Sequence, residues 1–461
     1  MFSEASFLAD DLIGARTAIA EGHTDAVSAM RQSLAAANSD VCRHVFLELF
    51  TDTAEQQARS LDEMRRAGGP LPPLGGLAVS IKALFDVHGR VTTSGSKILA
   101  DDAPATADCP AVQRLRDAGA ALIGHTNQSE FAFSAVGINP HHGTPANPAV
   151  PDDGIARIPG GSTSGGAVSV ATGAAWAALG SDTGGSLRIP AALQGLVGFK
   201  NTARLTPADG SIPLSPSLDT TGMISRSVRD AALLHGIIAA RPVRLAQRPV
   251  AGWRIGVPDT VMLDALEPAV AAAFEQTLAT LRDAGARIES ITLPELAEVA
   301  SINAGGGFAP VEAWTWHRHQ LAERESDYDP RVARRIRRGE QMSAAEYIDL
   351  QRARRDWIAR MEGRLREFDV MLSPTVPIIA PPLAPLLDDD ERFFTVNAQL
   401  LRNPSVVNLL DGCALSLPCQ QPGEAPVGLM VWQRALADET VLAASLAIEA
   451  RLRGRDVRTG S

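Results

Sequence analysis

Short apolar segments with strand character alternate with helical segments along almost the whole chain. Strands are predicted over residues 77–87, 121–124, 253–257, 288–293 and 369–374, because these segments are short and mostly apolar. Helices are predicted within residues 7–66 and over 108–120, 167–176, 227–240, 262–284, 344–367 and 439–453. This alternation is typical of an α/β protein. No change in composition marks a linker, since residues 241–252 and 377–387 look like loops within one domain.

The size and charge of the chain limit its function class. Its 461 residues suffice for two to three ordinary domains or for one large α/β domain. The hydrophobic content of 45% and the charged content of 21% are ordinary for a globular protein. The net charge of −10 opposes non-specific binding to nucleic acid and to anionic membranes. No apolar run reaches the length of about 18 residues that a membrane span needs, so we expect no membrane association.

The cysteines and the first residues predict a cytoplasmic protein. Four scattered cysteines, Cys42, Cys109, Cys413 and Cys419, are too few for a disulfide framework and are expected to be reduced. The N-terminal segment MFSEASFLADDLIGA contains acidic residues and no basic region, so we expect that it is not a secretory signal.

Two segments combine many glycines with serine: PGGSTSGGAVSVA at 159–171 and GSDTGGSLRIPAA at 180–192. Dense glycine leaves backbone N–H groups accessible, and successive N–H groups of this kind form binding sites for anions. The lysine that a phosphate-binding loop requires follows neither segment, and the dinucleotide pattern GxGxxG is absent. An oxyanion hole beside a nucleophilic serine is the remaining functional interpretation. The structural alternative is a pair of tight turns that pack helix on strand.

Among the residue types that can act as a general base, lysine fits this sequence best. The GxSxG pattern of α/β-hydrolases does not occur at Ser162, Ser164 or Ser186, and none of the nine histidines stands out. Lys82 lies in the apolar segment VSIKALF, where burial lowers the pKa of a lysine. A neutral lysine can accept a proton from a serine. The alternative is a lysine on an edge strand that discourages aggregation. Lysine is scarce here, since only Lys82, Lys97 and Lys200 occur among 43 basic residues.

The order of these segments resembles the amidase signature family. Similar segments include TNQSEFAFS (126–134), NPHHGTPANP (139–148), GLVGFK (195–200) and SPSLDTTGMISRSVRDAA (215–232), with weaker similarity at 372–377 and 416–431. The resemblance implies one domain, 1–461, with a large mixed β-sheet covered by helices on both faces. Residues 1–66 would form an N-terminal helical part, 70–235 the core with the catalytic residues, and 236–461 the remainder with substrate-pocket loops.

The resemblance also implies a mechanism, namely hydrolysis of a carboxylic amide or a urea-type C–N bond through an acyl-enzyme, releasing ammonia or an amine. Its Ser–cis-Ser–Lys triad would consist of the nucleophile Ser186, the relay Ser162 and the base Lys82. The remaining implied site residues are an oxyanion hole of the N–H groups of Thr183, Gly184, Gly185 and Ser186, with Asp182 and Arg188 bracing the loop. Three positions depart from the family pattern: Ala83 stands where many members have aspartate, Thr163 where serine is common, and Asn201 where proline is usual.

The substrate pocket is expected to involve segments 132–142 and 305–320, which we interpret as loops. Phe133, Trp314, Trp316 and His317 are candidates to line it, although aromatic residues at such positions are often simply packed. No metal and no cofactor are expected, because no HExxH motif and no Cys/His cluster with zinc spacing occurs. The expected partner is a small amide substrate. The resemblance also suggests a homodimer, with or without a small accessory subunit.

Three other functions stay open at the level of the sequence. The first is an amidotransferase subunit that uses ammonia from glutamine, although NPHHGTPANP differs from the usual segment of that subgroup. The second is a serine transpeptidase or β-lactamase, because Ser94 to Lys97 form an SxxK motif, although the SDN and KTG partner motifs are missing. The third is a non-catalytic binding protein on the same fold.

Overall fold

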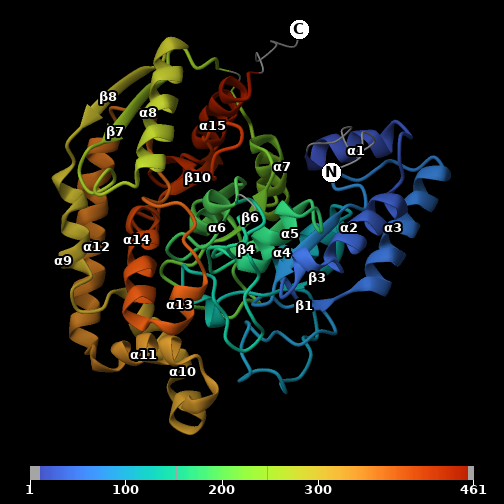
Figure 1. Ribbon diagram of the computed structural model, residues 1–461, viewed down its shortest axis with the longest axis horizontal. Helices are drawn as coiled ribbons and strands as arrows, with labels where there is room; N and C mark the ends of the chain where they lie inside the picture. Colours follow the sequence, from blue (N-terminus) through green and yellow to red (C-terminus); the bar gives the residue numbers. More distant parts are fainter. Residues whose placement is uncertain (1–10, 151–152, 247, 455–461) are drawn as a thin grey trace.

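The computed structural model describes residues 11–150, 153–246 and 248–454, and its centre is one mixed β-sheet (Figure 1). Its eleven strands are arranged in the order β1-β3-β2-β4-β6-β5-β10-β11-β9-β7-β8. The strands are β1 (Phe46–Leu49), β2 (Ala78–Lys82), β3 (Ala121–Thr126), β4 (Ala177–Ser181), β5 (Val197–Lys200), β6 (Thr221–Ser225), β7 (Arg254–Pro258), β8 (Arg287–Ile291), β9 (Val370–Pro374), β10 (Cys413–Pro418) and β11 (Gly428–Gln433).

Parallel pairing occurs in two parts of the sheet. β2 is parallel to both β3 and β4, and β7 is parallel to both β8 and β9. The strands between these two groups pair antiparallel, as does β1 with β3. β2 is therefore an internal strand, so the edge-strand interpretation of its lysine is wrong.

The helices cover both faces of the sheet. They are α1 (Leu12–Ala20), α2 (Ala26–Ala37), α3 (Thr51–Arg66), α4 (Pro110–Asp117), α5 (Ser164–Ala171), α6 (Arg188–Leu193), α7 (Val228–Ile238), α8 (Pro268–Asp283), α9 (Glu298–Ile302), α10 (Phe308–Arg324), α11 (Pro330–Arg337), α12 (Ala344–Leu365), α13 (Ala384–Asp388), α14 (Asp390–Leu409) and α15 (Asp438–Leu452). Every residue of β2, β3, β4, β5, β6, β9 and β11 is buried, and a strand is buried on both faces only when both are covered. The predicted fold class is confirmed.

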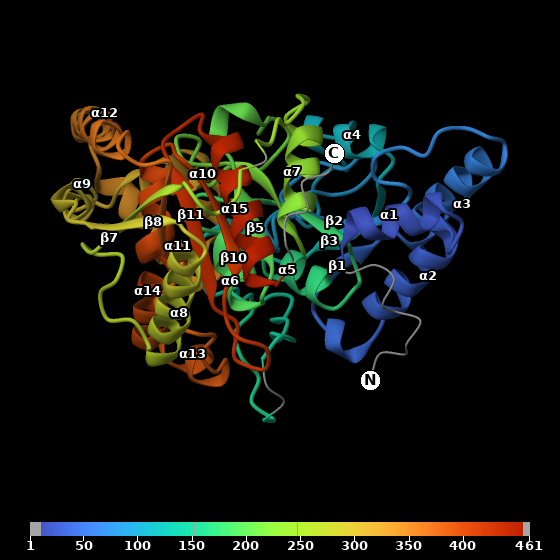
Figure 2. The same ribbon diagram turned by 90° about the horizontal axis from the view of Figure 1, so that it is seen from above.

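The ends of the molecule are formed by different parts of the chain. Figure 2 shows α1, α2 and α3 at the end near β1, and α9 and α12 at the opposite end near β7 and β8. Within the ranges given above, no helix combines the length and the apolar character that crossing a membrane requires.

Several predicted boundaries were wrong. The segment 7–66, predicted as helical, contains the strand β1, which pairs with β3. Residues 7–10 of this segment lie outside the described ranges. So does most of the N-terminal segment MFSEASFLADDLIGA, for which we expect no secretory signal. The predicted strand 77–87 ends at Lys82. The helix expected over 167–176 begins earlier, at Ser164, and stops before Gly173, whose φ of 84° is unfavourable for other residues.

The segment 305–320 is mostly helix rather than loop. The glycines at the start of this segment favoured the loop prediction, but α10 begins directly after Gly307. Earlier in the chain, α8 ends just before Gly285, which adopts a φ of 90°, as the sequence predicted.

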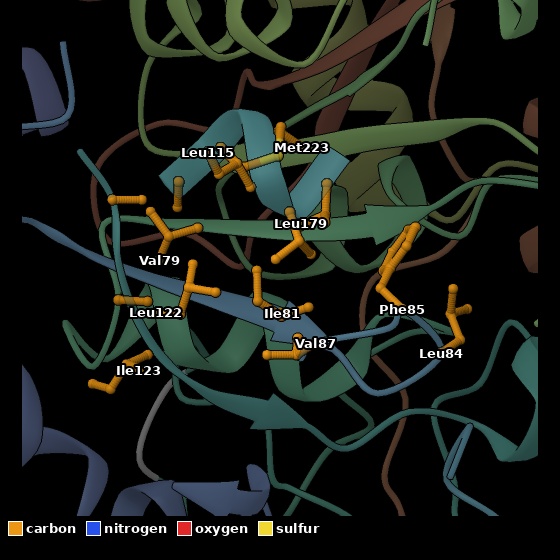
Figure 3. Close-up of a cluster of buried hydrophobic side chains, with 14 of the residues drawn as sticks. Val79, Ile81, Leu84, Phe85, Val87, Leu115, Leu122, Ile123, Leu179 and Met223 are labelled. Atoms are coloured by element: carbon orange, nitrogen blue, oxygen red, sulfur yellow. The ribbon is translucent and has the colours of Figure 1, made fainter. Parts of the chain in front are cut away.

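Apolar side chains from β2, β3 and β4 form a continuous buried cluster (Figure 3). Val79 and Ile81 of β2 pack with Leu122 of β3 and Leu179 of β4, and each is at most 1% exposed. This cluster excludes water from the strand that ends in Lys82.

Candidate active site

The site begins where two parallel neighbours of the sheet end. The register of β2 and β4 pairs Ile81 with Leu179, so Lys82 and Ser181 lie close together at the carboxyl ends of these strands. Loops that follow the carboxyl ends of parallel strands commonly form binding sites in α/β proteins. The chain continues from β4 into the segment 182–187, which contains Ser186.

Lys82 is completely buried and contacts two serines. Its Nζ lies 2.7 Å from Ser162 Oγ and 2.9 Å from Ser181 Oγ, and donates a hydrogen bond to each. Burial lowers the pKa of Lys82 to about 7, against the opposing influence of Asp219 and Asp182. A substantial fraction of this lysine is therefore neutral near pH 7 and can accept a proton. The sequence did not single out Ser181, although it lies within the GSDTGGS segment.

Ser162 lies in the loop before α5, and the peptide bond between Gly161 and Ser162 is cis. Its carbonyl oxygen accepts a hydrogen bond from the N–H of Ser129 at 3.2 Å. Close packing at the start of α5 requires glycine, because a Cβ on Gly165 would lie 2.4 Å from the carbonyl oxygen of Val45. The glycines of the first segment thus bring the start of α5, and with it Ser162, close to the sheet.

Asp182 organises the loop that contains Ser186. Its carboxylate accepts hydrogen bonds from the N–H groups of Gly185 at 2.9 Å and Leu187 at 3.1 Å. It also accepts bonds from two nitrogens of Arg188, at 2.9 and 3.1 Å, and from Asn408 Nδ2 at 2.9 Å. Burial favours the neutral acid, but the charge and hydrogen bonds of Arg188 prevail and lower the pKa of Asp182 to about 2. Asp182 and Arg188 therefore brace the loop as a buried ion pair.

The hydrogen bonds of this loop leave three N–H groups available. The Gly185 N–H is already bound to Asp182, so its expected place in an oxyanion hole is not supported. The N–H groups of Thr183, Gly184 and Ser186 have no acceptor among the described residues. A cluster of free N–H groups beside a serine can stabilise a negatively charged oxygen.

Thr183 is fixed by a second buried acid. Its hydroxyl donates to Asp219, which also accepts hydrogen bonds from the N–H groups of Leu214 and Ser215 at 3.0 Å each. Burial raises the pKa of Asp219 to about 6 despite these bonds. Asn408 lies far from the glycine-rich segments in the chain, and no sequence pattern identified it. Asp219 lies in the segment 215–232 that resembles the family, but the sequence analysis did not single it out.

A cavity of about 270 Å³ opens beside Ser186, which is 5% exposed. Thr183 and Gly184 line it together with Ser186. Its apolar lining includes Phe133, Leu214, Leu218, Phe308, Leu401 and Leu409. The expected contribution of Phe133 and of both segments, 132–142 and 305–320, agrees with this lining. The volume lies near the lower end of ordinary ligand sites, which span roughly 300–1,000 Å³, and fits a small substrate.

The other three aromatic candidates do not line this cavity. Trp316 and His317 pack around Phe131, with ring centroids 5.7 and 4.4 Å from it. His317 is fully buried, and its Nδ1 lies 3.0 Å from the hydroxyl of Tyr328. Trp314 is half-buried and packs against the same hydrophobic core. These residues of α10 serve packing, and we do not assign them to substrate binding.

The SxxK motif does not form a comparable site. Ser94 is buried, and its Oγ accepts a hydrogen bond from Gln128 at 3.0 Å. Lys97 is exposed, and no hydrogen bond joins it to Ser94. The geometry therefore gives no support to the transpeptidase interpretation.

Breaking the buried ion pair should destabilise the protein strongly. Both side chains of the Arg188–Asp182 pair are 0% exposed, so Arg188→Met leaves an uncompensated buried carboxylate. We expect the free energy of unfolding in denaturant to fall by about 3–5 kcal/mol. In the control Arg204→Met, the lost pair with Asp411 has side chains that are 53% and 30% exposed, and we expect a loss below about 1 kcal/mol. Equal losses in both variants would contradict the bracing role.

Comparison with known proteins shows the family to which the chain belongs. A family model of amidases matches residues 25–442. The chain is 36% identical over 406 residues to the 2-amino-5-chloromuconic acid deaminase of Comamonas testosteroni, covering 86% of each chain. It is 34% identical over 480 residues to a glutamyl-tRNA(Gln) amidotransferase subunit of Thermobifida fusca (strain YX), covering 95% of each. A crystal structure of an amidase superposes with a TM-score of 0.86 at 32% identity, over 96% of this chain and 99% of that chain. The chain therefore belongs to the amidase family of enzymes, as its glycine- and serine-rich segments indicated.

Proposed function

We propose that the protein hydrolyses a small carboxylic amide or urea-type substrate with Ser186 as nucleophile, Ser162 as proton relay and Lys82 as base. One observation carries this proposal: the Nζ of a buried lysine with a pKa of about 7 lies 2.7 Å from Ser162 Oγ. A lysine of ordinary pKa would be protonated and could not act as a base.

In the proposed reaction, neutral Lys82 takes a proton from Ser162 Oγ, which takes the proton of Ser186 Oγ. Ser186 Oγ then bonds to the carbonyl carbon, and the carbonyl oxygen becomes an oxyanion. The N–H groups of Thr183, Gly184 and Ser186 stabilise this oxyanion.

The second half of the reaction reuses the same residues. The relay returns the proton to the leaving nitrogen, so the C–N bond breaks and ammonia or an amine departs. The same relay deprotonates water, which attacks the ester on Ser186, releases the acid and restores the enzyme. Asp182 and Arg188 hold the loop and take no part in proton transfer.

The test is release of ammonia from a panel of small primary amides. We expect turnover by the protein alone, without added protein partners. No turnover of any amide, under conditions where the protein is folded, would contradict the proposal.

The second candidate is an amidotransferase subunit, because relatives that cover almost the whole chain carry that name. In this case hydrolysis of glutamine would be coupled to a partner subunit. L-Glutamine as the preferred substrate, with activity dependent on such a partner, would favour it. The homodimer, the accessory subunit, the single-domain organisation and the cytoplasmic location stay predictions from resemblance and composition.

Activity should be independent of metal ions. The proposed proton transfers need only serine and lysine, and the described ranges contain no group of three or more His, Cys, Asp or Glu side chains suited to hold a metal ion. We expect dialysis against a chelator to leave kcat/KM unchanged. A loss that added zinc restores would show that a metal takes part.

A further inference from the structure

The cavity beside Ser186 has two charged side chains in its described lining, and both are arginines: Arg335 and Arg338. Arg335 lies near the end of α11, and Arg338 begins the short 3₁₀ turn Arg338–Gln341 that follows it. This part of the chain packs against α10, which contributes Phe308 to the same cavity (Figure 1). Two positive charges thus face a small cavity with largely apolar walls.

Neither arginine is neutralised by a carboxylate within the described part of the chain. Arg335 is half-buried, donates a hydrogen bond to the carbonyl oxygen of Phe133 and stacks 4.3 Å from its ring centre. Asp329 influences it electrostatically but forms no ion pair with it. The side chain of Arg338 is exposed and has neither a hydrogen bond nor an ion pair with any described residue.

Other arginines of α11 contrast with these two. Arg331 pairs with Asp390 at 2.6 Å, and Arg337 pairs with Glu325. These two arginines, which do not line the cavity, thus have acidic partners, whereas Arg335 and Arg338 have none among the described residues.

The two cavity arginines also repel one another. Burial and the nearby charge of Arg338 lower the pKa of Arg335 to about 10, so Arg335 stays charged at neutral pH. A bound carboxylate would relieve this repulsion, and the planar guanidinium group matches a carboxylate in two-point hydrogen bonding.

We propose that the preferred substrate is an amide that also carries a carboxylate, with the amide carbon at Ser186 and the carboxylate bound by Arg338 and Arg335. This inference rests on the proposed hydrolysis at Ser186 and names its substrate class. A zwitterion such as glutamine fits less well, because the described lining contains no Asp or Glu to pair with its ammonium group.

Matched substrates test the proposal. Malonamate, succinamate and glutaramate each have a neutral counterpart with a methyl group in place of the carboxylate: propionamide, butyramide and valeramide. We expect kcat/KM for ammonia release to favour at least one half-amide over its counterpart by roughly 10–100-fold, the value of a charge-assisted hydrogen bond. L-Glutamine should be poorer than glutaramate. The proposal is overturned if every neutral amide equals or exceeds its half-amide, or if glutamine is preferred.

Variants connect this preference to the arginines. Because Arg338 is exposed, Arg338→Met should fold, and we expect it to reduce the ratio of half-amide to neutral amide by roughly 10–100-fold. Arg335→Lys, which keeps the charge but loses the planar fork, should reduce it less. Arg334→Met is the matched control, since Arg334 is exposed on α11 and does not line the cavity; it should keep the wild-type ratio. An unchanged ratio in Arg338→Met and in Arg335→Lys overturns the proposal.

Measurements of substrate binding test the carboxylate site independently of the proposed hydrolysis at Ser186. Calorimetry with the Ser186→Ala protein should show tighter binding of the preferred half-amide than of its neutral counterpart, whether or not Ser186 is the nucleophile. Equal binding would overturn the carboxylate site and leave amide hydrolysis standing. If the wild-type protein bound the half-amide but did not hydrolyse it, the proposed amide hydrolysis would be overturned and the carboxylate site would stand.

Discussion

The Ser186→Ala variant should lose amide hydrolysis while it keeps its fold. The substitution removes only the attacking oxygen, and the bonds that hold the loop come from Asp182 and from the backbone, not from the Ser186 hydroxyl. We expect kcat below a few per cent of the wild-type value, with an unchanged circular dichroism spectrum and unfolding midpoint. Steady-state ammonia release measures the loss.

A matched control is available in the preceding segment. Ser164 is buried at the start of α5, and its Oγ makes only a long hydrogen bond of 3.5 Å to the carbonyl oxygen of Asn127. Ser164→Ala should therefore retain most of the activity. If Ser186→Ala kept substantial turnover, or if both variants lost equal amounts, Ser186 would not be the nucleophile.

The Lys82→Arg variant should be almost as inactive as Lys82→Ala. Arginine keeps the positive charge but cannot deprotonate in a protein, so it cannot serve as a base. We expect a loss in kcat of roughly 10²–10⁴-fold, the usual share of general-base catalysis. Lys97→Arg is the control, because Lys97 is exposed, and it should be close to wild type. Lys200 is unsuitable as a control, because its buried Nζ donates to the carbonyl oxygens of Asn201 and Gly412.

The dependence of activity on pH also tests whether Lys82 is the base. Burial lowers the pKa of Lys82 to about 7, so its neutral, basic form increases as the pH rises through 7. Wild-type activity should therefore increase through about pH 7 and remain high in mildly alkaline solution. Near-normal kcat in Lys82→Arg, or activity that falls as the pH rises through 7, would make Lys82 a fixed charge and exclude the proposed relay.

Local patterns predicted an α/β protein, and the family resemblance added the large mixed sheet covered by helices and the proposed site residues. The apolar segment that ends in Lys82 is a buried internal strand, as its composition suggested, and the two glycine-rich segments lie at the ends of neighbouring elements. The sequence predicted β2, β3, β7, β8 and β9 and missed the other strands of the described sheet, namely β1, β4, β5, β6, β10 and β11. β1, for example, has four residues that lie among helices and is defined by its pairing with β3, which is a long-range property.

The details of the pocket could not be predicted from local sequence. The aromatic residues Trp316 and His317 would look the same in the sequence whether they faced a cavity or packed around Phe131, as they do. Arg335 and Arg338 stand among about forty arginines, and only the fold determines which of them face Ser186.

The most direct test of the central claim is to locate the reactive serine chemically. A fluorophosphonate reacts with an activated serine hydroxyl, and peptide mass mapping identifies the labelled residue. We predict a label on Ser186 in the wild-type protein, with labelling that is much slower in Lys82→Arg. A label on Ser94 or on another serine would contradict the assignment of Ser186 as nucleophile. Labelling of Ser186 that is equally fast in Lys82→Arg would contradict the assignment of Lys82 as base.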